Sequence, residues 1–566
     1  MCNNTVQVGI KCYGITELFR KTFTDPMPVL AIDLGTSNTV GVVMDRGKYR
    51  IVEIDGSHLL PSAVSYNDDG TIKAVGKAAL KYYWTNNNVV RFVKRIIGYG
   101  VDTAEMKQYI DNCGCEVVKG RDGKAAFLIP AFPDRSLTPT IVSSHIIRCM
   151  ADHAERQCDS KMEGLVVSVP AFFNQEQINE TRIAAEMANV CDKKNIKIVS
   201  EPVAAALDYG VVSQRDSTIM VIDFGGGTAD ICIMKINKST FQVLGKHGDR
   251  CLGGDDVTNA FVKLVEKKYL DQYGEPLIQF SSKSMCRRIK EEELKDRVEM
   301  AKLQFSDTDH VMIRLDDIHD QYVKKTEDYD EDEDLSEEEE MEEIVIRRSE
   351  FNQCIDGLLK RVIQLTKETL VIAKLTKNDI DNVIMVGGSS RLLALQDLVY
   401  EEYGEKMVYP NNPDECVAFG ACRASSYALK AANIHFIDVV PHFYGCVKCG
   451  ETPGKDEFLP LIPRNTPFPT DKVFREPLNL VQVEDGTSYP EASLDVWMST
   501  DGTMQTAREV NKLSVTNANK AGGNSVTVQF TLDDSGMIHA MITQRIGENP
   551  LVPDTIMCSM QPQAVH

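Results

Sequence analysis

Two aspartates lie in nearly the same sequence pattern, although they are far apart in the chain. Asp33 lies within "AIDLGTSNTV" and Asp223 lies within "VIDFGGGTAD". In each stretch an apolar, strand-like run ends on the acid and is followed by glycine and hydroxyl residues. Glycine is entropically costly and is kept where the backbone bends sharply or comes close to another group. The repeated pattern therefore predicts two tight hairpins that serve a close backbone contact.

The chemistry that such hairpins can perform is phosphate binding. Backbone N–H groups that converge in a tight turn form a concave site for anions. A carboxylate at the same place would repel phosphate unless a hydrated Mg²⁺ lay between them. A single glycine-rich turn is better interpreted as a plain hairpin. Two matched copies, each with its acid, favour a nucleotide site in which both hairpins close on one triphosphate.

A third glycine-rich stretch supports a nucleotide site. "NVIMVGGSSR", at residues 382–391, is a strand-like run followed by Gly387, Gly388 and two hydroxyl residues that open a helix. This arrangement lets the backbone approach a flat base or a ribose. Close packing of the strand against the helix is the alternative interpretation of this stretch taken alone.

The pattern of apolar and polar residues along the chain predicts the elements that position these residues. Strand-like and helical runs alternate from about Val29 to about Ala432, which predicts α/β architecture. From His435 onward, short alternating runs with proline and glycine predict a compact β domain. Residues 327–343 are acidic at 13 of 17 positions. This run separates two strand-like pieces, so we expect an insertion in a surface hairpin of the α/β part.

Charge and composition exclude several classes of protein. The net charge is −21, and outside the acidic run 62 basic residues face 70 acidic ones, a net charge of −8. No basic face is indicated, which argues against nucleic acid as a partner. No apolar run is long enough to span a bilayer, so no membrane partner is expected. The 16 cysteines are scattered through apolar segments, as expected of reduced thiols, and we expect a cytoplasmic location. For residues 1–28 a loosely packed extension is favoured, and a targeting segment is the alternative.

At this point the residues carry a family resemblance. The chain resembles the seventy-kilodalton heat-shock chaperones, whose ATPase domain has the fold of actin and the sugar kinases. The blocks that carry the resemblance follow in the family's order: "AIDLGTSNTV", "RFVKRIIG", "VVSVPAFFNQEQ", "VSEPVAAALDYG", "VIDFGGGTAD", "CLGGDDVTNA", "MVGGSSRL" and "NPDECVAFGA". Actins and sugar kinases do not carry this set, so neither is the expected function.

The resemblance implies a domain organisation. It implies an N-terminal extension (1–28), an α/β actin-like ATPase domain of two duplicated lobes (29–432), a linker (433–440) and a β-sandwich peptide-binding domain (441–566). "LIPRNTPFPT" and "VTVQFTLDDSGMIHAMI" resemble strands of that sandwich. Because the sequence stops at His566, soon after these strands, we expect the family's helical lid to be missing. The family's leucine-rich linker is not recognisable in "ANIHFIDVVPHFYG".

The resemblance also implies roles for residues that hold phosphate, metal and the attacking water. Asp33 would hold hydrated Mg²⁺, and Lys94 would touch the γ-phosphate and stabilise charge in the transition state. Glu201 and Asp223 would order metal-bound water and the attacking water, and Asp230 would place potassium or water. The first phosphate loop would comprise Thr36, Ser37 and Asn38, and the second Gly225, Gly226, Gly227 and Thr228, with Thr228 among the catalytic residues.

A second set of residues would surround the adenosine of ATP or ADP. Glu299, Lys302 and Ser306 occupy the family's adenosine-binding positions, and Glu299 and Lys302 lie at i, i+3 on one helix face. The pocket would be completed by Gly387, Gly388, Ser389, Arg391 and Asp414. Taken alone, a Glu–Lys pair on a helix is usually a solvated face, and Lys94 with its neighbour would be an ordinary surface pair.

Three positions depart from the family's pattern. Leu303 replaces the arginine that stacks on adenine, and losing that cation–π contact costs on the order of 1 kcal/mol of affinity. Ile178 replaces an arginine that pairs with Pro170 in relaying the nucleotide state to the peptide-binding domain. Phe172 replaces a tyrosine of the same relay. We therefore expect altered coupling between the two domains with the hydrolysis residues intact.

Two functions of different classes follow. The first is an ATP-dependent chaperone that binds unfolded or extended apolar client peptides, with a J-domain co-chaperone and a nucleotide exchange factor as partners. The second is a non-cycling regulator or scaffold that uses ATP structurally. The intact Lys94, Glu201, Asp223 and Thr228 favour the first function. The altered relay, the missing lid and the unfamiliar linker favour the second.

Overall fold

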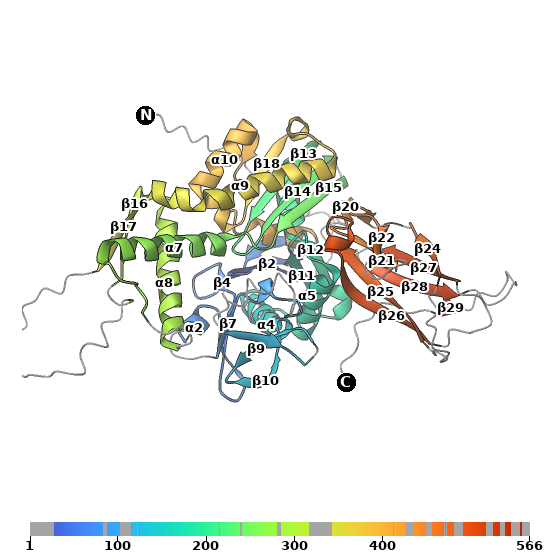
Figure 1. The fold of residues 1–566 in the computed structure, drawn as a ribbon, viewed down its shortest axis with the longest axis horizontal. Coiled ribbons are helices and arrows are strands. Elements are labelled where there is room, and N and C mark those ends of the chain that lie inside the picture. Colours follow the sequence, from blue (N-terminus) through green and yellow to red (C-terminus); the bar gives the residue numbers. More distant parts are fainter. Residues whose placement is uncertain are drawn as a thin grey trace, which may run out of the picture.

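Two large β-sheets with the same strand topology lie at the centre of the computed structural model (Figure 1). The spatial order of the first sheet is β12 (Ile196–Ser200), β11 (Gly164–Val169), β1 (Val29–Leu34), β2 (Asn38–Asp45) and β3 (Lys48–Ile51), with β4 (Leu60–Pro61) paired to β2. Strands β1, β2 and β3 form an antiparallel meander, and β1, β11 and β12 are parallel. Burial on both faces explains why β1 and β11 are almost wholly apolar.

The second sheet repeats this order. Its strands are β19 (Met407–Val408), β18 (Asn382–Val386), β13 (Ser217–Phe224), β14 (Ala229–Asn237), β15 (Thr240–Asp249), β20 (His435–Val439) and β23 (Pro467–Phe468). Strands β13, β14 and β15 form the meander, and β13, β18 and β19 are parallel. In register, Asp33 lies opposite Val40 on β2, and Asp223 lies opposite Asp230 on β14. The repeated sequence pattern is therefore one hairpin used twice.

The structure describes residues 28–82, 88–101, 115–121, 123–213, 216–237, 240–279, 285–315, 318, 342–410, 412–425, 435–448, 456–468, 470, 472–479, 491–516, 525–532, 538–544 and 555–556. Almost all of the predicted N-terminal extension (1–28) and most of the acidic run (327–343) lie outside these residues. Among the helices that are described, none is both long and apolar enough to cross a bilayer.

Helices cover the sheets and fill the space between them. The larger ones are α4 (Pro139–Cys158), α5 (Gln175–Met187), α6 (Glu201–Ser213), α7 (Gly254–Tyr273), α8 (Met285–Gln304), α9 (Arg348–Ala373), α10 (Leu393–Tyr403) and α11 (Cys416–Arg423). Helix α5 begins with a capping box, in which the Asn174 side chain accepts from Gln177 N and the Gln177 side chain accepts from Asn174 N. Helices α6 and α11 pack on each other, and their apolar residues share one core with strands of both sheets.

Smaller elements project from this body. The sheets β6 (Ile72–Val75), β5 (Ala63–Tyr66), β7 (Val89–Arg91) and β10 (Phe132–Leu137), β9 (Ala125–Ile129), β8 (Glu116–Lys119) extend the first half. The hairpin of β16 (His310–Arg314) and β17 (Glu343–Arg347) extends the second half beside α7 and α8 (Figure 1). The acidic run thus connects the two strands of a hairpin, and Glu343, its last residue, is already the first residue of β17.

The β domain consists of two four-stranded antiparallel sheets. One contains β22 (Glu457–Ile462), β21 (Phe443–Lys448), β25 (Glu491–Ser499) and β26 (Arg508–Thr516); the other contains β24 (Phe474–Asn479), β27 (Ser525–Leu532), β28 (Ile538–Gln544) and β29 (Thr555–Ile556). Tyr444 and Val496 of the first sheet lie in one buried cluster with Phe474 and Phe530 of the second. In the described chain beyond α11, the helical element is the 3-10 turn Met504–Thr506.

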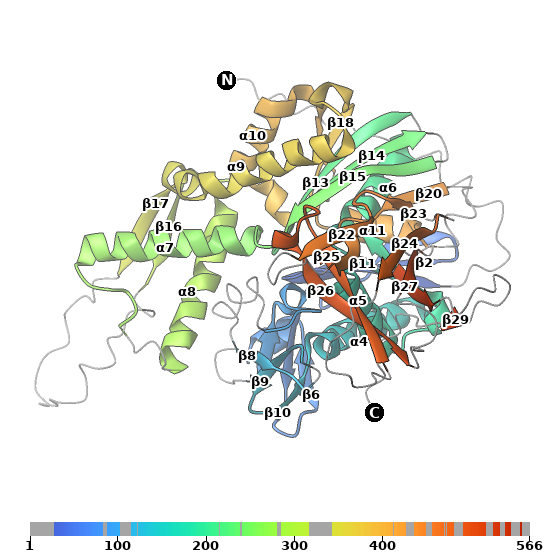
Figure 2. The same ribbon diagram turned by 45° about the vertical axis from the view of Figure 1, so that its right-hand side comes forward.

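Most of the segment predicted to be the linker (433–440) forms a strand. Residues His435–Val439 form β20, which pairs in parallel with Thr240–Gln242 of β15. β20 also pairs antiparallel with Pro467–Phe468 of the β domain. The connection therefore belongs to the same sheet as the second aspartate hairpin, and Figure 2 shows the β domain close against the helices beneath that sheet.

Candidate nucleotide-binding site

A cavity of about 450 Å³ lies between the two aspartate hairpins. Its walls also include η1 (Val93–Arg95), the first turn of α7, the end of α8 and the loop after β18. It is lined by the following predicted site residues: Asp33, Thr36, Ser37, Asn38, Lys94, Glu201, Asp223, Gly225, Gly226, Gly227, Thr228, Glu299, Lys302, Ser306, Gly387, Gly388, Ser389, Arg391 and Asp414. The remaining one, Asp230, is fully buried behind the wall. The fold thus gathers in one place residues that the sequence spreads over nearly 400 positions.

The glycines of the second loop allow the two hairpins to touch. A Cβ atom on Gly226 would lie 2.5 Å from Ser37 Oγ, and one on Gly227 would lie 2.6 Å from Thr36 Oγ1. Gly225 is different, because its Cβ would meet nothing closer than Thr228 O at 3.7 Å. A side chain at Gly226 or Gly227 would force Ser37 or Thr36 to shift, so close packing of the loops favours glycine at two of the three positions. Sequence analysis, which assigned all three glycines to phosphate binding, did not supply this reason.

One buried lysine faces several carboxylates at the centre of the cavity. Lys94 Nζ donates to Glu201 Oε1, and both residues are only 6% exposed. Asp33 Oδ1 accepts a hydrogen bond from Ser168 Oγ at 2.7 Å. Asp223 belongs to the same buried charge cluster. Besides burial, the nearby Glu201 raises the pKa of Asp223 and Lys94 lowers it. The acids outnumber the single lysine, so the cluster has spare negative charge for a cation.

Burial governs the titration of this cluster. It raises the pKa of Glu201 to about 8 and lifts that of Asp223 well above its ordinary value. It also raises the pKa of Asp33. Burial alone would lower the pKa of Lys94, but Glu201 and Asp33 outweigh it and the pKa is raised. Lys94 therefore stays charged, while burial disfavours the ionised form of the carboxyls and a bound cation would favour it.

The donor set fits a hydrated hard cation. Carboxylate oxygens are the ligands that Mg²⁺ prefers, and Mg²⁺ usually keeps several waters. Within the described residues no three acidic, histidine or cysteine side chains converge closely enough to chelate a metal directly. Asp230 Oδ1 accepts from Ala171 N at 2.6 Å, whereas its buried Oδ2 has no hydrogen-bond partner. These observations fit a metal held through its water shell, with Asp33 and Asp223 nearest the cavity.

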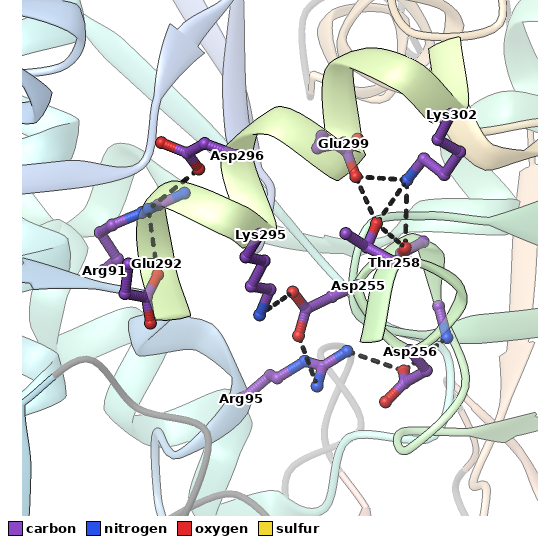
Figure 3. Close-up of polar contacts among 12 residues, drawn as sticks. Arg91, Arg95, Asp255, Asp256, Thr258, Glu292, Lys295, Asp296, Glu299 and Lys302 are labelled. Carbon is purple, nitrogen blue, oxygen red and sulfur yellow. Dashed lines mark hydrogen bonds and ion pairs between the residues drawn. The ribbon is translucent and has the colours of Figure 1, made fainter. Parts of the chain in front are cut away.

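Helices α7 and α8 build the opposite end of the cavity. Lys302 Nζ donates to Glu299 Oε2 at 2.6 Å, to Thr258 Oγ1 at 2.9 Å and to Gly254 O at 3.1 Å. Thr258 also donates to Glu299, so the three side chains hold one another in place (Figure 3). Sequence analysis missed Thr258, although it lies within the block "CLGGDDVTNA".

The loop after β18 closes the same end. Gly387 has φ +81°, and a Cβ there would lie 2.5 Å from Phe224 O, so only glycine fits. Ser389 Oγ donates to Gly225 O at 2.9 Å, and this bond fastens the loop to the second hairpin. Arg391 and Asp414 form an ion pair at 2.7 Å on the rim.

Ion pairs connect the two sides of the cavity. Arg95, which is buried, contacts Asp255 at 3.3 Å and Asp256 at 2.9 Å at the start of α7. Lys295 on α8 also contacts Asp255, at 2.6 Å. Figure 3 shows a second connection, from Arg91 of β7 to the acidic face of α8: the closest N–O distances are 3.8 Å to Glu292 and 3.7 Å to Asp296. Sequence analysis missed these cross-cavity pairs.

Two of the three departures from the family pattern, Leu303 and Ile178, have definite surroundings. Leu303 lines the cavity and is 54% exposed, so it presents an apolar surface where the family has a charged one. Ile178 packs against a small buried cluster of Ile97, Val169 and Phe173. Position 178 therefore contributes an apolar contact and carries no charge.

A cavity of this kind, closed by two glycine hairpins over acids and one lysine, is what a nucleotide-binding protein needs. Comparison with known proteins identifies the family. The model of the Hsp70 protein family matches residues 29–550, so the chain belongs to the Hsp70 family, as the sequence blocks predicted. Membership implies an actin-like nucleotide-binding domain followed by a β-sandwich substrate-binding domain.

Curated relatives agree with this assignment. The chain is 31% identical over 447 residues to "Heat shock 70 kDa protein 6, chloroplastic" of Arabidopsis thaliana. The aligned residues make up 78% of this chain and 58% of that protein. It is 31% identical over 463 residues to the "Stromal 70 kDa heat shock-related protein, chloroplastic" of Pisum sativum, covering 81% and 61%. It is 32% identical over 446 residues to "Chaperone protein dnaK3" of Synechococcus elongatus, covering 78% and 55%. The alignments thus span little more than half the length of these relatives.

Proposed function

We propose that this chain is an ATP-dependent chaperone that binds extended apolar peptide segments under the control of ATP binding and hydrolysis. The observation that carries the proposal is the continuity of the second sheet. Its strands β13 and β14 form the phosphate hairpin, and the same sheet includes β20 and β23 at the entrance to the β domain. A nucleotide-driven shift of this sheet would therefore act directly on the second domain.

The residues of the cavity suit ATP hydrolysis. The N–H groups of the two hairpins would hold the phosphates, and Lys94 would neutralise charge that develops on the transferred phosphoryl group. Glu201 and Asp223 would orient the attacking water, with Thr228 beside them. Asp33 and Asp223 would hold Mg²⁺ through water, and the metal would supply charge neutralisation for the phosphates. Asp230, with its unpartnered Oδ2, would place potassium or water.

The finer architecture belongs to the same proposal. We assign residues 29–432 to a nucleotide domain of two duplicated lobes, because both large sheets have the same topology. We assign 433–440 to the connection and 441–566 to a β-sandwich, because the two four-stranded sheets share a core. An extended peptide would bind there through main-chain hydrogen bonds and side-chain pockets.

Partners and location remain predictions. The proposed cycle requires a J-domain co-chaperone and a nucleotide exchange factor, and it needs neither nucleic acid nor a membrane. A cytoplasmic location was predicted from the sequence, whereas two of the relatives carry "chloroplastic" in their names. A plastid location is therefore the alternative that localisation of a tagged full-length chain would decide.

Two observations favour a second function, a non-cycling regulator or scaffold that uses ATP structurally. Leu303 weakens the base contact, and Ile178 carries no charge for the relay. Single-turnover ATP hydrolysis, with and without an apolar peptide and a J-domain, separates the two functions. Stimulated turnover that is lost in Lys94→Ala supports the chaperone cycle. Tight ATP binding without stimulated turnover, or a fully active Lys94→Ala protein, favours the scaffold.

A further inference from the structure

One hydrogen bond joins the β domain to the segment behind the catalytic acids. His442 Nε2 lies 2.8 Å from the carbonyl oxygen of Phe172. Because a carbonyl can only accept, Nε2 must carry the hydrogen and donate it. His442 and Phe172 are each 5% exposed, so water cannot readily replace either partner. Breaking this bond inside the folded protein would leave a buried donor unsatisfied, which is costly.

The other end of this segment is tied to the cavity. Ala171 N donates to Asp230 Oδ1 at 2.6 Å, and Asp230 is fully buried. Asp230 in turn acts electrostatically on Glu201 and Asp223 within the catalytic cluster. Ala171 and Phe172 are consecutive residues, so a single peptide unit separates the hydrogen bond to Asp230 from the hydrogen bond to His442.

Packing makes this unit move with the sheet. The ring of Phe172 lies on Gly248, where a Cβ would come within 2.1 Å of its Cδ1 atom. Gly248 is the register partner of Asp230 on β15. Phe173, the next residue, is held in the apolar cluster that Ile178 contacts. The segment therefore cannot swing away from Asp230 without losing packing on both sides.

We infer that His442 is the residue through which the β domain senses the nucleotide cavity, by way of the chain Asp230, Ala171, Phe172 and His442. When the contacts of Asp230 change, the peptide that it holds shifts the Phe172 carbonyl relative to the imidazole, and docking of the β domain is strengthened or weakened. The link uses no charged side chain at position 178, so it operates despite Ile178. The inference rests on the proposed ATP-dependent function.

A pair of variants of the full chain tests this link. His442→Gln keeps a side-chain N–H at the end of a chain of similar reach, whereas His442→Leu keeps bulk and loses the donor. Two quantities are measured with and without Mg-ATP: hydrogen exchange of the β20 amides, which reports docking, and the dissociation constants of ATP and ADP. By reciprocity, a lost coupling changes both. We expect His442→Leu to reduce the ATP effect on exchange by about fivefold or more, and His442→Gln to retain it.

A matched control separates this link from general loosening of the interface. Arg464 also crosses between the domains, donating to Lys246 O at 3.2 Å and to His247 Nδ1 at 3.1 Å, but these contacts bypass Asp230. Arg464→Gln should change docking equally with and without ATP. A further test uses NMR of wild type with labelled histidines. One protected imidazole N–H signal, absent from His442→Gln, should shift when ATP is added. This test does not depend on the folding of His442→Leu.

The outcomes are distinct. An unchanged ATP response in His442→Leu, equal loss in the Leu and Gln variants, or an imidazole signal indifferent to ATP overturns the role of His442, while wild-type hydrolysis leaves the proposed function standing. A wild type that binds no ATP overturns the proposed function and the link together.

Discussion

Thr36 and Gly227 belong to different aspartate hairpins and lie in close contact. A Cβ on Gly227 would lie 2.6 Å from Thr36 Oγ1 and 2.9 Å from Arg95 Nε. The close approach determines how near the two halves of the cavity can come. A methyl group at position 227 would therefore force the side chains of Thr36 and Arg95 to shift.

Gly227→Ala should therefore lower both stability and nucleotide affinity. Overpacking of a fixed contact costs about 1–3 kcal/mol, and the displaced hairpins would no longer hold the phosphates together. Gly225→Ala is the matched control, since its Cβ has 3.7 Å of free distance. Denaturant unfolding and calorimetric ATP titration of both variants check this. Equal behaviour of the two variants would contradict the packing argument.

Arg91→Ala should speed nucleotide release. Arg91 connects β7 to Glu292 and Asp296 across the cavity, but at 3.7 to 3.8 Å and with partial exposure. Such pairs contribute at most about 1 kcal/mol, which corresponds to a roughly two- to fivefold faster release of ADP. Stopped-flow displacement of a fluorescent ADP analogue measures the rate of ADP release. Arg121→Ala, which removes an exposed pair with Asp134 away from the cavity, should leave the rate unchanged.

Leu303→Arg should tighten adenine nucleotide binding. A guanidinium stacked on the base adds a cation–π contact of about 1 kcal/mol, or roughly fivefold in the dissociation constant. Met300→Arg controls for added charge, because Met300 is 61% exposed on the same helix but does not line the cavity. Calorimetric titration with Mg-ADP compares the variants. No change in Leu303→Arg would mean that the base does not lie over position 303.

His442 predicts a specific loss of stability in acid. Burial lowers its pKa to about 3, and three arginines, Arg250, Arg464 and Arg508, act in the same direction. An unfolded histidine has a pKa near 6.5. Below that pH the imidazole is protonated in the unfolded chain but stays neutral in the folded chain, which favours unfolding. The contribution of the neutral His442 to the free energy of unfolding is complete above pH 6.5. It is lost as the pH falls toward 3, by at most about 1.4 kcal/mol per pH unit.

Unfolding of wild type and His442→Gln at pH 7.5 and 5.5 isolates this term. Gln keeps a donor for Phe172 O but does not titrate, so the variant should lose less stability than wild type over that interval. The other titrating groups are common to both proteins and cancel in the comparison. Identical losses would show that His442 is not the group responsible.

Much of the site could be recognised from the sequence because its parts are local. A strand that ends on Asp33 or Asp223 and turns through glycine is encoded by adjacent residues, and the structure confirms both hairpins. The alternation of apolar runs likewise predicted the α/β part and the change to β structure after His435. The ordered blocks predicted the family, which the comparison confirms.

The tertiary structure decided the features that depend on distant residues. Thr258 is a site residue because α7 packs beside α8, and no spacing in the sequence shows this. The connecting segment became β20 because β15 offered an open edge, which a local pattern does not record. His442 lies 270 positions from Phe172, and only the packing of the β domain brings the imidazole to that carbonyl. Local patterns determine which element forms; contacts across long separations are fixed by how the elements pack.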